Sequence, residues 1–329
     1  MLRIKSEDAV GRRLAYDTTY VGVDGASILL RRGHVLTMDD IEKLKNSGTY
    51  YVWVEGGEGE EGEICEWDIT PYVASRVLGK NLSYSYSGQG STRIVAERPG
   101  VLKVDAEEVT RFNSNRWVLL ITRSNNRALG RGELAGVVEA VPFKMSRQDL
   151  MSLALRLLLY LDEFKLTRLG AVVTGTEIYE GRKRGAYLPV IRSKCERYGW
   201  ELVYDEVAPD DEARIAAAVG RAIDAGAQAV VVTGGMSVDA TDKTMDAIKQ
   251  LGAEMIAYGM PMKPTTMSAL AYLDGVPIFA VSAGGIYYRE WNSIDAVLAR
   301  VMAGERIDSM DIAAMGVGGL TEAFLERGH

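Results

Sequence analysis

The second half of the chain alternates short apolar runs with longer segments in which apolar residues recur at helical spacing. The runs include residues 169–173, 229–232 and 277–281, with a shorter one at 201–204. Strands in a parallel sheet have this composition because helices cover both faces of the sheet. Helices are expected at residues 187–198, 211–225, 241–251 and 288–302. The pattern predicts an α/β unit with a doubly wound, mostly parallel sheet.

The first half of the chain has shorter strands and more frequent turns. Strands are expected at residues 27–30 and 50–54, and Thr37 is a candidate N-cap for the helix between them. This arrangement indicates a small α+β unit. Further along, four short strands at the spacing of a small β-barrel or sandwich are expected. They are residues 93–96, 100–104, 117–121 and 134–141.

A helix is expected to join the two halves. Ser146 and Asp149 have the form of a capping box, and the apolar residues that follow predict a helix that ends near residue 163. The expected organisation is an α+β domain, a β-rich domain, the connecting helix, the α/β domain and a C-terminal tail. Their boundaries are 1–83, 84–145, 146–168, 169–307 and 308–329.

Composition limits the possible classes of function. The chain has 329 residues and a formal net charge of -7, so it has no basic field for nucleic acid or an acidic membrane. Cys65 and Cys195 have neither disulfide-framework nor metal-ligand spacing. The first residues lack the apolar core of a signal peptide, and the longest apolar stretch is too short to span a bilayer. We therefore expect a cytoplasmic protein that binds any phosphate through a small local site.

Three of the expected strands in the α/β half end in turns of small residues. The carboxyl ends of parallel strands meet at one edge of an open sheet, where ligands bind, and glycine turns expose amides that can hold an oxyanion. Each turn can also be only a tight connection between a strand and a helix. The candidate binding residues in these turns are Thr174, Gly175, Thr176, Thr233, Gly234, Gly235, Ser237, Ser282 and Gly284.

Charged residues lie close to these turns in the sequence. Glu177, Asp239 and Asp242 are candidate catalytic acids and candidate ligands of Mg²⁺, a hard ion that proteins bind through carboxylates together with substrate phosphates. The alternative for Asp239 and Asp242 is helix capping. Lys243 and Lys263 are the nearest cations and could contact a phosphate, or they could be solvated surface lysines.

Other nucleotide and hydrolase signatures do not occur. His34 and His329 are the only histidines and neither lies in the loops of the α/β half, which argues against histidine-dependent metal hydrolase and Ser-His-Asp mechanisms. The chain contains neither a Walker sequence nor the three-glycine Rossmann spacing. The predicted anion site therefore belongs to another type of fold.

Four motifs in order give the α/β half a resemblance to a known family. From about residue 169 to residue 307 the chain resembles the molybdopterin-binding domain of molybdenum-cofactor biosynthesis proteins. This family includes molybdopterin adenylyltransferases, molybdopterin molybdotransferases and gephyrin-like proteins. Residues 31–36 and the helix after them resemble a stand-alone molybdopterin-binding subfamily associated with molybdenum hydroxylases. The four motifs are Thr174-Gly175-Thr176-Glu177-Ile178-Tyr179-Glu180-Gly181, Val207-Ala208-Pro209-Asp210-Asp211, Thr233-Gly234-Gly235-Met236-Ser237-Val238-Asp239 and Met262-Lys263-Pro264.

The resemblance implies roles for the candidate residues. Gly234, Gly235 and Ser237 would hold the terminal phosphate of molybdopterin, and the three acids would serve magnesium, adenylate or molybdate chemistry. The sequence also departs from the family pattern. Thr176, Gly185 and Ala240 stand at or near positions where relatives have acids, and the turn after residue 281 and the loop at residues 265–266 are altered. These changes remove acids more than phosphate-binding turns.

The hypothesis that fits these features is a protein that binds molybdopterin or a molybdenum-cofactor intermediate, as a carrier or maturation factor for a molybdoenzyme. An active Mg²⁺-dependent molybdopterin adenylyltransferase or molybdotransferase is the alternative. A degenerate interaction or sensory protein, with a pocket blocked by Met236, Tyr179 or Tyr287, is a further one. A pyridine-nucleotide amidohydrolase is the last, because a related domain occurs in competence-damage-type proteins. A homo-oligomer is expected.

Overall fold

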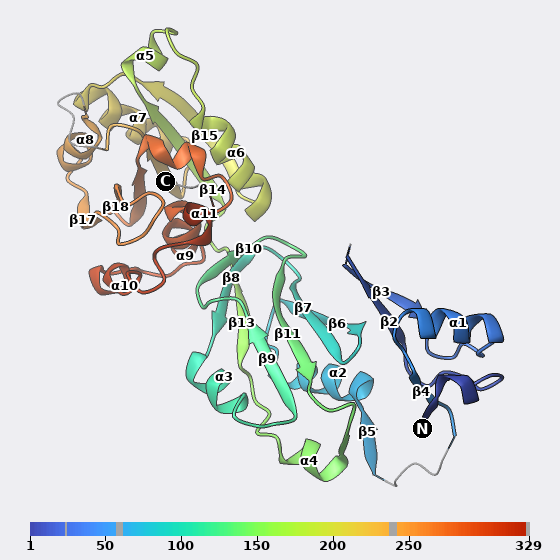
Figure 1. Cartoon of the computed structure of the whole chain (residues 1–329). Helices are drawn as coiled ribbons and strands as arrows, with labels where there is room; N and C mark the ends of the chain where they lie inside the picture. Colours follow the sequence, from blue (N-terminus) through green and yellow to red (C-terminus); the bar gives the residue numbers. More distant parts are fainter. Residues whose placement is uncertain (24, 57–61, 237–241, 327–329) are drawn as a thin grey trace.

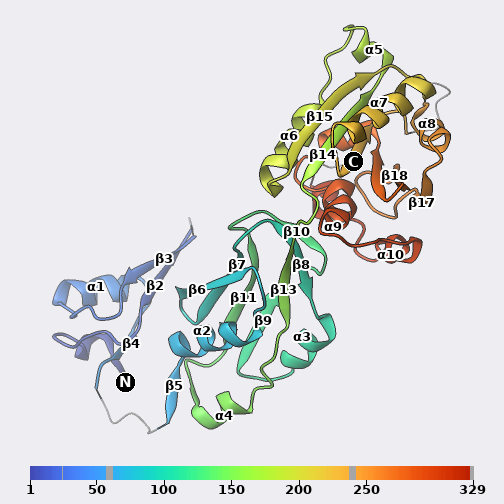
Figure 2. The same cartoon turned by 180° about the vertical axis from the view of Figure 1, so that it is seen from behind.

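The computed structural model describes residues 1–23, 25–56, 62–236 and 242–326. The chain forms three units that follow one another along an elongated molecule, with the N-terminal unit at one end and the α/β unit at the other (Figures 1 and 2). Within the described residues no helix is long and apolar enough to cross a membrane.

The N-terminal unit packs one helix and short strands around a small core. Thr37 is the N-cap of the helix, as the sequence predicted, and it forms a capping box with Asp40. Leu14, Leu44 and Val54 are fully buried in this core. The elements are β1 (Leu2–Lys5), η1 (Ser6–Asp8), β2 (Thr18–Gly22), β3 (Gly25–Leu30), α1 (Met38–Asn46) and β4 (Tyr51–Val54). Strand β1 pairs with β4, and β2 with β3, all antiparallel.

The core of the middle unit is formed mainly by two sheets and the helix α2. One sheet has the order β6-β7-β11-β9, the other has the order β10-β8-β13, and α2 packs against the first. Side chains of both sheets and of α2 meet in a single cluster. The elements are β5 (Glu63–Cys65), α2 (Glu66–Val77), β6 (Leu82–Gly88), β7 (Ser91–Ala96), β8 (Gly100–Val104), α3 (Ala106–Phe112), β9 (Val118–Thr122), β10 (Arg127–Leu129), β11 (Leu134–Ala140), β12 (Lys144–Ser146), α4 (Arg147–Ser152) and β13 (Leu159–Glu163).

The connecting helix predicted from Ser146 to about residue 163 is wrong. Ser146 does cap a helix by accepting a hydrogen bond from the Asp149 amide, but α4 ends at Ser152. Strand β13 follows and pairs antiparallel with β8. Leu159 and Leu161 are fully buried while the residues between and after them are partly exposed, which is the period of a strand. The segment therefore completes the core of the middle unit.

The C-terminal unit is an α/β domain whose sheet has the order β15-β14-β16-β19-β18-β17. The first four strands are parallel, β18 runs antiparallel to them, and the edge strand β17 pairs antiparallel with β18. The elements up to the sheet's last strand are β14 (Arg168–Thr174), α5 (Thr176–Tyr179), α6 (Tyr187–Tyr198), β15 (Glu201–Ala208), α7 (Glu212–Asp224), β16 (Ala229–Thr233), α8 (Thr244–Gln250), β17 (Glu254–Tyr258), β18 (Ser268–Leu273) and β19 (Val276–Val281). The predicted fold class, α/β with a mostly parallel sheet, is confirmed.

Apolar side chains cover both faces of this sheet. On β16, Val231 belongs to the cluster with α6 and α9, whereas Val230 and Val232 belong to the cluster with α7 and α8. The last elements are η2 (Ala283–Tyr287), the π-helical η3 (Ile294–Leu298), α9 (Ala299–Met302), α10 (Ser309–Ala314) and α11 (Glu322–Leu325). The helix expected at residues 288–302 therefore starts at Ile294. Because Ser268 pairs with Val281, the loop between β17 and β18 lies at the carboxyl edge of β19.

Candidate functional site

Three strand ends meet at one edge of the C-terminal sheet. Val173 pairs with Thr233, and Thr233 pairs with Val281, so the turns after β14, β16 and β19 are neighbours. The Gly234 amide donates to the Val281 carbonyl at 3.0 Å, and the Thr174 hydroxyl donates to the Thr233 carbonyl at 3.0 Å. The structure thus brings together the three turns that the sequence singled out.

The turn after β16 requires glycine at two successive positions. Gly234 has φ +93° and Gly235 has φ +56°. A Cβ atom on Gly234 would lie 2.8 Å from the Thr174 carbonyl oxygen, and one on Gly235 would lie 2.8 Å from Thr244 Oγ1. Thr244 is fully buried and donates to the Gly234 carbonyl at 2.9 Å. Thr174 and Thr244 therefore hold this turn tightly, and both glycines are needed for its shape.

Several backbone amides at this edge already have acceptors within the protein. The Gly175 amide donates to the Ala208 carbonyl at 3.1 Å, and the Gly234 amide is taken by Val281 as described. For the Gly235 amide, no acceptor is recorded in the described parts of the chain. The hydroxyl oxygen of Thr233 is also buried without a recorded hydrogen-bond partner. The unused hydrogen-bonding capacity lies at Gly235 and Thr233 more than at Gly234.

Asp210 fixes the first turn, a role that the sequence analysis did not assign. Its carboxylate accepts hydrogen bonds from the Thr176 amide at 2.8 Å and the Thr176 hydroxyl at 3.0 Å. The Asp210 amide in turn donates to the Thr176 hydroxyl at 3.0 Å. The signal available in the sequence was the motif at residues 207–211, because Asp210 lies two residues after the end of β15, the strand that pairs with β14.

The predicted acids are only partly described. Ser237 and Asp239 lie outside the described residues. Glu177 is exposed on α5, and its nearest ion-pair partner is Lys183 at 3.9 Å. Asp242 is half-buried just before α8. In the portions of the chain that are described, no group of three or more His, Cys, Asp and Glu side chains could hold a metal ion. The acid set and the magnesium site remain predictions.

The two candidate lysines are in different surroundings. Lys243 Nζ forms an ion pair with Glu212 Oε1 at 2.8 Å, and this carboxylate raises the pKa of Lys243. Lys263 shows no ion pair with a described residue, and its Nζ lies 5.8 Å from the ring centroid of Phe324. Its backbone is held by the C-terminal segment, because its carbonyl accepts from the Thr321 hydroxyl at 2.7 Å. Lys263 is therefore the freer of the two cations.

The third turn rests on a buried hydroxyl cluster. The hydroxyls of Thr265 and Ser268 each lie 2.8 Å from Ser293 Oγ. Thr265 has φ +70°, which is unusual for a β-branched residue and marks a position that its surroundings enforce. The Tyr187 hydroxyl donates to the Ser282 carbonyl, and Gly284 is exposed beside it. In the sequence, the only indication of this cluster was that residues 265–266 depart from the pattern of the family that the chain resembles.

The side chains proposed to block the pocket do not fill this edge. Met236 is 2% exposed and packs in the core beneath the turn, together with residues of α7 and α8. Tyr179 and Tyr287 are 50% and 65% exposed. These side chains give no support to a plugged site.

Comparison with known proteins identifies the segment that contains this edge. Residues 170–286 match the family model described as "probable molybdopterin binding domain", so the resemblance drawn from the motifs is confirmed over this segment. Residues 3–56 match a family model described only as a domain of unknown function.

Individual relatives match part of the chain. A molybdopterin adenylyltransferase of Pyrococcus furiosus is 27% identical over 108 residues, which are 33% of this chain and 63% of the relative. The tungsten cofactor synthesizing protein MoaB of Pyrococcus furiosus is 20% identical, with 47% of this chain and 92% of that chain covered and a TM-score of 0.33. The molybdopterin biosynthesis enzyme MoaB of Thermus thermophilus is 16% identical, with 43% and 98% covered and a TM-score of 0.37.

Proposed function

We propose that the edge formed by the ends of β14, β16 and β19 binds the terminal phosphate of molybdopterin or of a molybdenum-cofactor intermediate, since it lies in the segment that matches the molybdopterin binding domain. The protein would act in molybdenum-cofactor biosynthesis or in the maturation of a molybdoenzyme. A molybdoenzyme partner and a homo-oligomeric state are part of this proposal.

The observation that carries the proposal is the packing of the Gly234-Gly235 turn. Thr174 and Thr244 lie so close to the two glycines that neither position has room for a side chain. A turn without side chains lets an anion approach the backbone amides closely, which is how glycine-rich turns bind phosphate. The amide of Gly235 is the donor that remains for this task within the described residues.

The charges nearby fit a small anion site on an acidic protein. With a formal net charge of -7, the protein does not attract anions over its whole surface, so binding has to be local. Lys263 belongs to the loop between β17 and β18, which lies at the carboxyl edge of β19, and it has no carboxylate partner among the described residues. We propose that Lys263 adds the cationic contact.

Binding without turnover is the form of the proposal that the described residues support best. Glu177 is exposed and loosely paired, and no metal-binding group of side chains occurs in the described segments. Adenylyl transfer or molybdate insertion would require magnesium ligands in addition to the phosphate-binding turn. Replacement of Asp242 by alanine tests this point, because an enzyme that uses Asp242 would lose turnover while its fold remained stable.

The direct experiment is a titration of the protein with molybdopterin, with two glycine variants compared. Gly235→Ala should weaken binding at least tenfold, because the new Cβ would collide with Thr244 and move the turn. Gly252→Ala is the matched control. Gly252 also has a positive φ of +74°, but nothing lies within 4 Å of its Cβ position. Gly252→Ala therefore introduces the same kind of backbone strain as Gly235→Ala, but its new Cβ does not collide with a neighbouring atom.

Two results would contradict the proposal. The wild-type protein could show no binding of molybdopterin at micromolar concentrations, or Gly235→Ala and Gly252→Ala could bind it equally well. Circular dichroism melting curves of both variants would establish that they are folded before their affinities are compared.

A further inference from the structure

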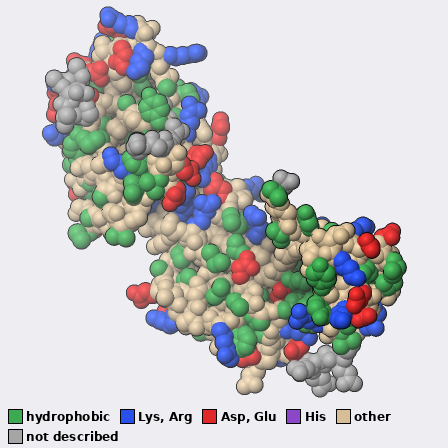
Figure 3. Space-filling view, viewed as in Figure 1, with side chains coloured by type: hydrophobic (Ala, Val, Ile, Leu, Met, Phe, Trp, Pro, Cys, Tyr) green, Lys and Arg blue, Asp and Glu red, His purple; other side chains and the backbone are tan. Residues whose placement is uncertain are grey.

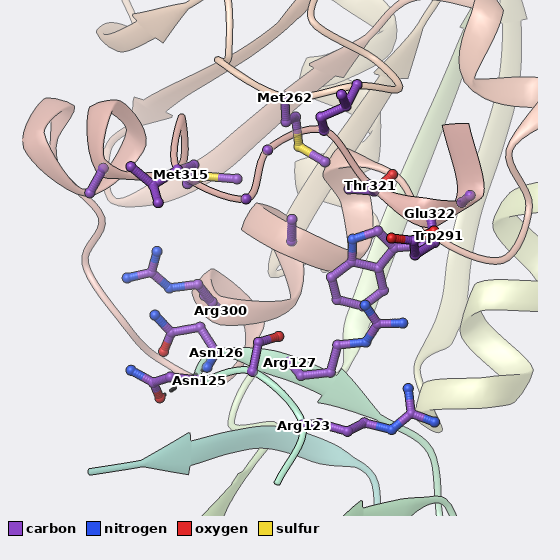
Figure 4. A pocket seen from close by; sticks show the side chains of 18 of the residues that line it. Arg123, Asn125, Asn126, Arg127, Met262, Trp291, Arg300, Met315, Thr321 and Glu322 are labelled. Atoms are coloured by element: carbon purple, nitrogen blue, oxygen red, sulfur yellow. Dashed lines mark hydrogen bonds between the residues drawn. The ribbon is translucent and has the colours of Figure 1, made fainter. Parts of the chain in front are cut away.

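A second cavity is lined by none of the residues of the three turns at the proposed molybdopterin edge. It has a volume of about 870 Å³ and lies between the middle unit and the C-terminal unit (Figure 4). The loop from β9 to β10 forms one side, and the C-terminal segment around α11 forms the other. Pockets of a few hundred to about a thousand Å³ are typical of small-molecule sites.

Two arginines on the β9–β10 side give this pocket a cationic wall. Arg123 and Arg127 both line it (Figure 4). The guanidinium of Arg127 lies 3.5 Å from the ring centroid of Trp291. Arg123 uses its Nε to donate to the Leu134 carbonyl at 2.8 Å and is otherwise exposed. Neither arginine forms an ion pair with any residue in the described segments.

The guanidinium of Arg127 is partly buried, and no carboxylate that the structure describes forms an ion pair with it. Its Nε is buried and has no hydrogen-bond partner among the described residues. Burial, together with the charges of Arg123 and Arg197, lowers the pKa of Arg127 from its ordinary value. The contact with Trp291 compensates only in part, because an aromatic face accepts no directed hydrogen bonds from the remaining donors. A partly desolvated guanidinium of this kind favours a bound oxyanion.

The opposite wall offers apolar surface. Met262 and Met315 line the pocket, and the same wall carries Val317 and Leu320, which are 96% and 57% exposed. Acidic residues also line this side, including Glu322, but none of them is paired with Arg127. An anion with an apolar body would therefore place its charge on the arginines and its body against the methionines and leucine.

Ion pairs between the two units hold the pocket open in this shape. Arg197 of α6 binds Glu133 of the middle unit through two hydrogen bonds, of 2.7 and 2.9 Å. Lys103 of β8 pairs with Glu305, which also accepts from Arg300 at 3.0 Å. Because these contacts fix both walls, binding would not require the units to move together first.

We propose that this pocket between the middle and C-terminal units is a second binding site, for a small organic molecule that carries a phosphate or carboxylate group on an apolar body. Arg123 and Arg127 bind the oxyanion, and Met262, Met315 and Leu320 contact the body. This site is inferred without reference to the proposed molybdopterin edge, so either proposal can fail without the other.

The test is isothermal titration calorimetry of the full chain with phenyl phosphate, phenylacetate and inorganic phosphate. Phenyl phosphate or phenylacetate should bind in the millimolar range or tighter, and inorganic phosphate should bind more weakly. If phenyl phosphate binds more tightly, the preferred oxyanion is a phosphate, and if phenylacetate binds more tightly, it is a carboxylate. Arg127→Gln should weaken binding about ten- to a hundredfold, the usual effect of losing hydrogen bonds to a charged group.

Two further variants keep the result interpretable. Arg123→Gln changes an exposed side chain, so it should fold normally and still weaken binding at least threefold. Arg76→Gln is the matched control, because Arg76 also lies over an aromatic ring, that of Tyr72, but far from this pocket in the middle unit. The proposal is overturned if neither aromatic probe binds at millimolar concentrations. It is also overturned if Arg76→Gln weakens binding as much as the two pocket variants, or if inorganic phosphate binds as tightly as phenyl phosphate.

Discussion

Replacement of Asp295 by asparagine should strongly destabilise the C-terminal unit. Asp295 is fully buried at the start of the π-helical turn η3, and both of its carboxylate oxygens lie 2.7 Å from Lys194 Nζ. It also accepts hydrogen bonds from the Tyr198 hydroxyl at 2.6 Å and from the backbone N–H of Asn292 at 2.7 Å. This single carboxylate therefore joins α6 to the segment that follows the third turn of the candidate site.

The expected cost follows from the burial of both charges. The side chain of Lys194 is only 3% exposed. Asparagine offers one acceptor oxygen and no negative charge, so the ammonium would stay in the interior without a counter-ion. Removing one partner of a buried ion pair costs about 3–5 kcal/mol, because the other charge is left uncompensated. We expect a loss of this size in the free energy of unfolding.

The assay is urea unfolding followed by circular dichroism at several pH values. Burial lowers the pKa of Lys194 in the native protein, and loss of Asp295 would lower it further. Between this lowered pKa and the value of about 10.4 in the unfolded chain, the unfolded state binds more protons than the folded state. The stability of Asp295→Asn should therefore rise as the pH increases, and its deficit relative to the wild type should shrink between neutral pH and about pH 10.

A second substitution separates charge from packing. Lys194→Met in the Asp295→Asn background removes the stranded ammonium and should recover most of the lost stability. The reasoning would be refuted if Asp295→Asn cost less than about 1 kcal/mol. It would also be refuted if the deficit did not depend on pH and the double variant were no more stable than Asp295→Asn.

Three further predictions concern the other units. Hydrogen bonds from neighbouring groups, with His34 first, hold the pKa of Asp40 well below its ordinary value. The ionised Asp40 carboxylate stabilises the fold above about pH 4, and this stabilisation is lost as the pH falls through the lowered pKa. Asp40→Asn should therefore lower the free energy of unfolding by about 1–3 kcal/mol at neutral pH, and by less when unfolding is measured in acid. Leu161→Ala should lower the free energy of unfolding by about 2–5 kcal/mol, whereas the exposed Leu157→Ala should change it by less than about 0.5 kcal/mol in the same urea titration. Arg197→Lys keeps the charge but loses the bidentate contact, and limited proteolysis between the middle and C-terminal units should become faster, while an unchanged cleavage rate would contradict this role.

Secondary structure in the C-terminal half was largely predictable because its signals are local. The helix at residues 187–198 was predicted with the bounds that α6 has, and the apolar runs became β14, β16 and β19. Strands β17 and β18 were missed, although both contain apolar runs, at residues 255–258 and 269–273. The segment at residues 159–163 was misread because its leucines are compatible with a helix until β8 offers a partner strand.

The candidate site was predictable only in part. Glycines at the ends of three apolar strands indicated an anion site at one sheet edge, and parallel topology then brought these turns together. The roles of Asp210, Thr244 and Thr265 could not be inferred, because each depends on contact with a residue that is distant in the sequence or on a backbone conformation that its surroundings impose.

By itself, the sequence determined the doubly wound C-terminal fold, the glycine turns and the local character of any anion binding, because periodicity, turn chemistry and net charge are properties of the chain. Only the tertiary structure decided which amides at the edge remain available. It showed that the Gly234 amide is taken by Val281 and that the Gly235 amide is not taken by any described residue. It also decided that Arg127 lies over Trp291 beside a large pocket, with no ion-pair partner in the described parts of the chain. The physical reason is that hydrogen bonds and desolvation depend on partners that only folding brings within a few ångströms of one another.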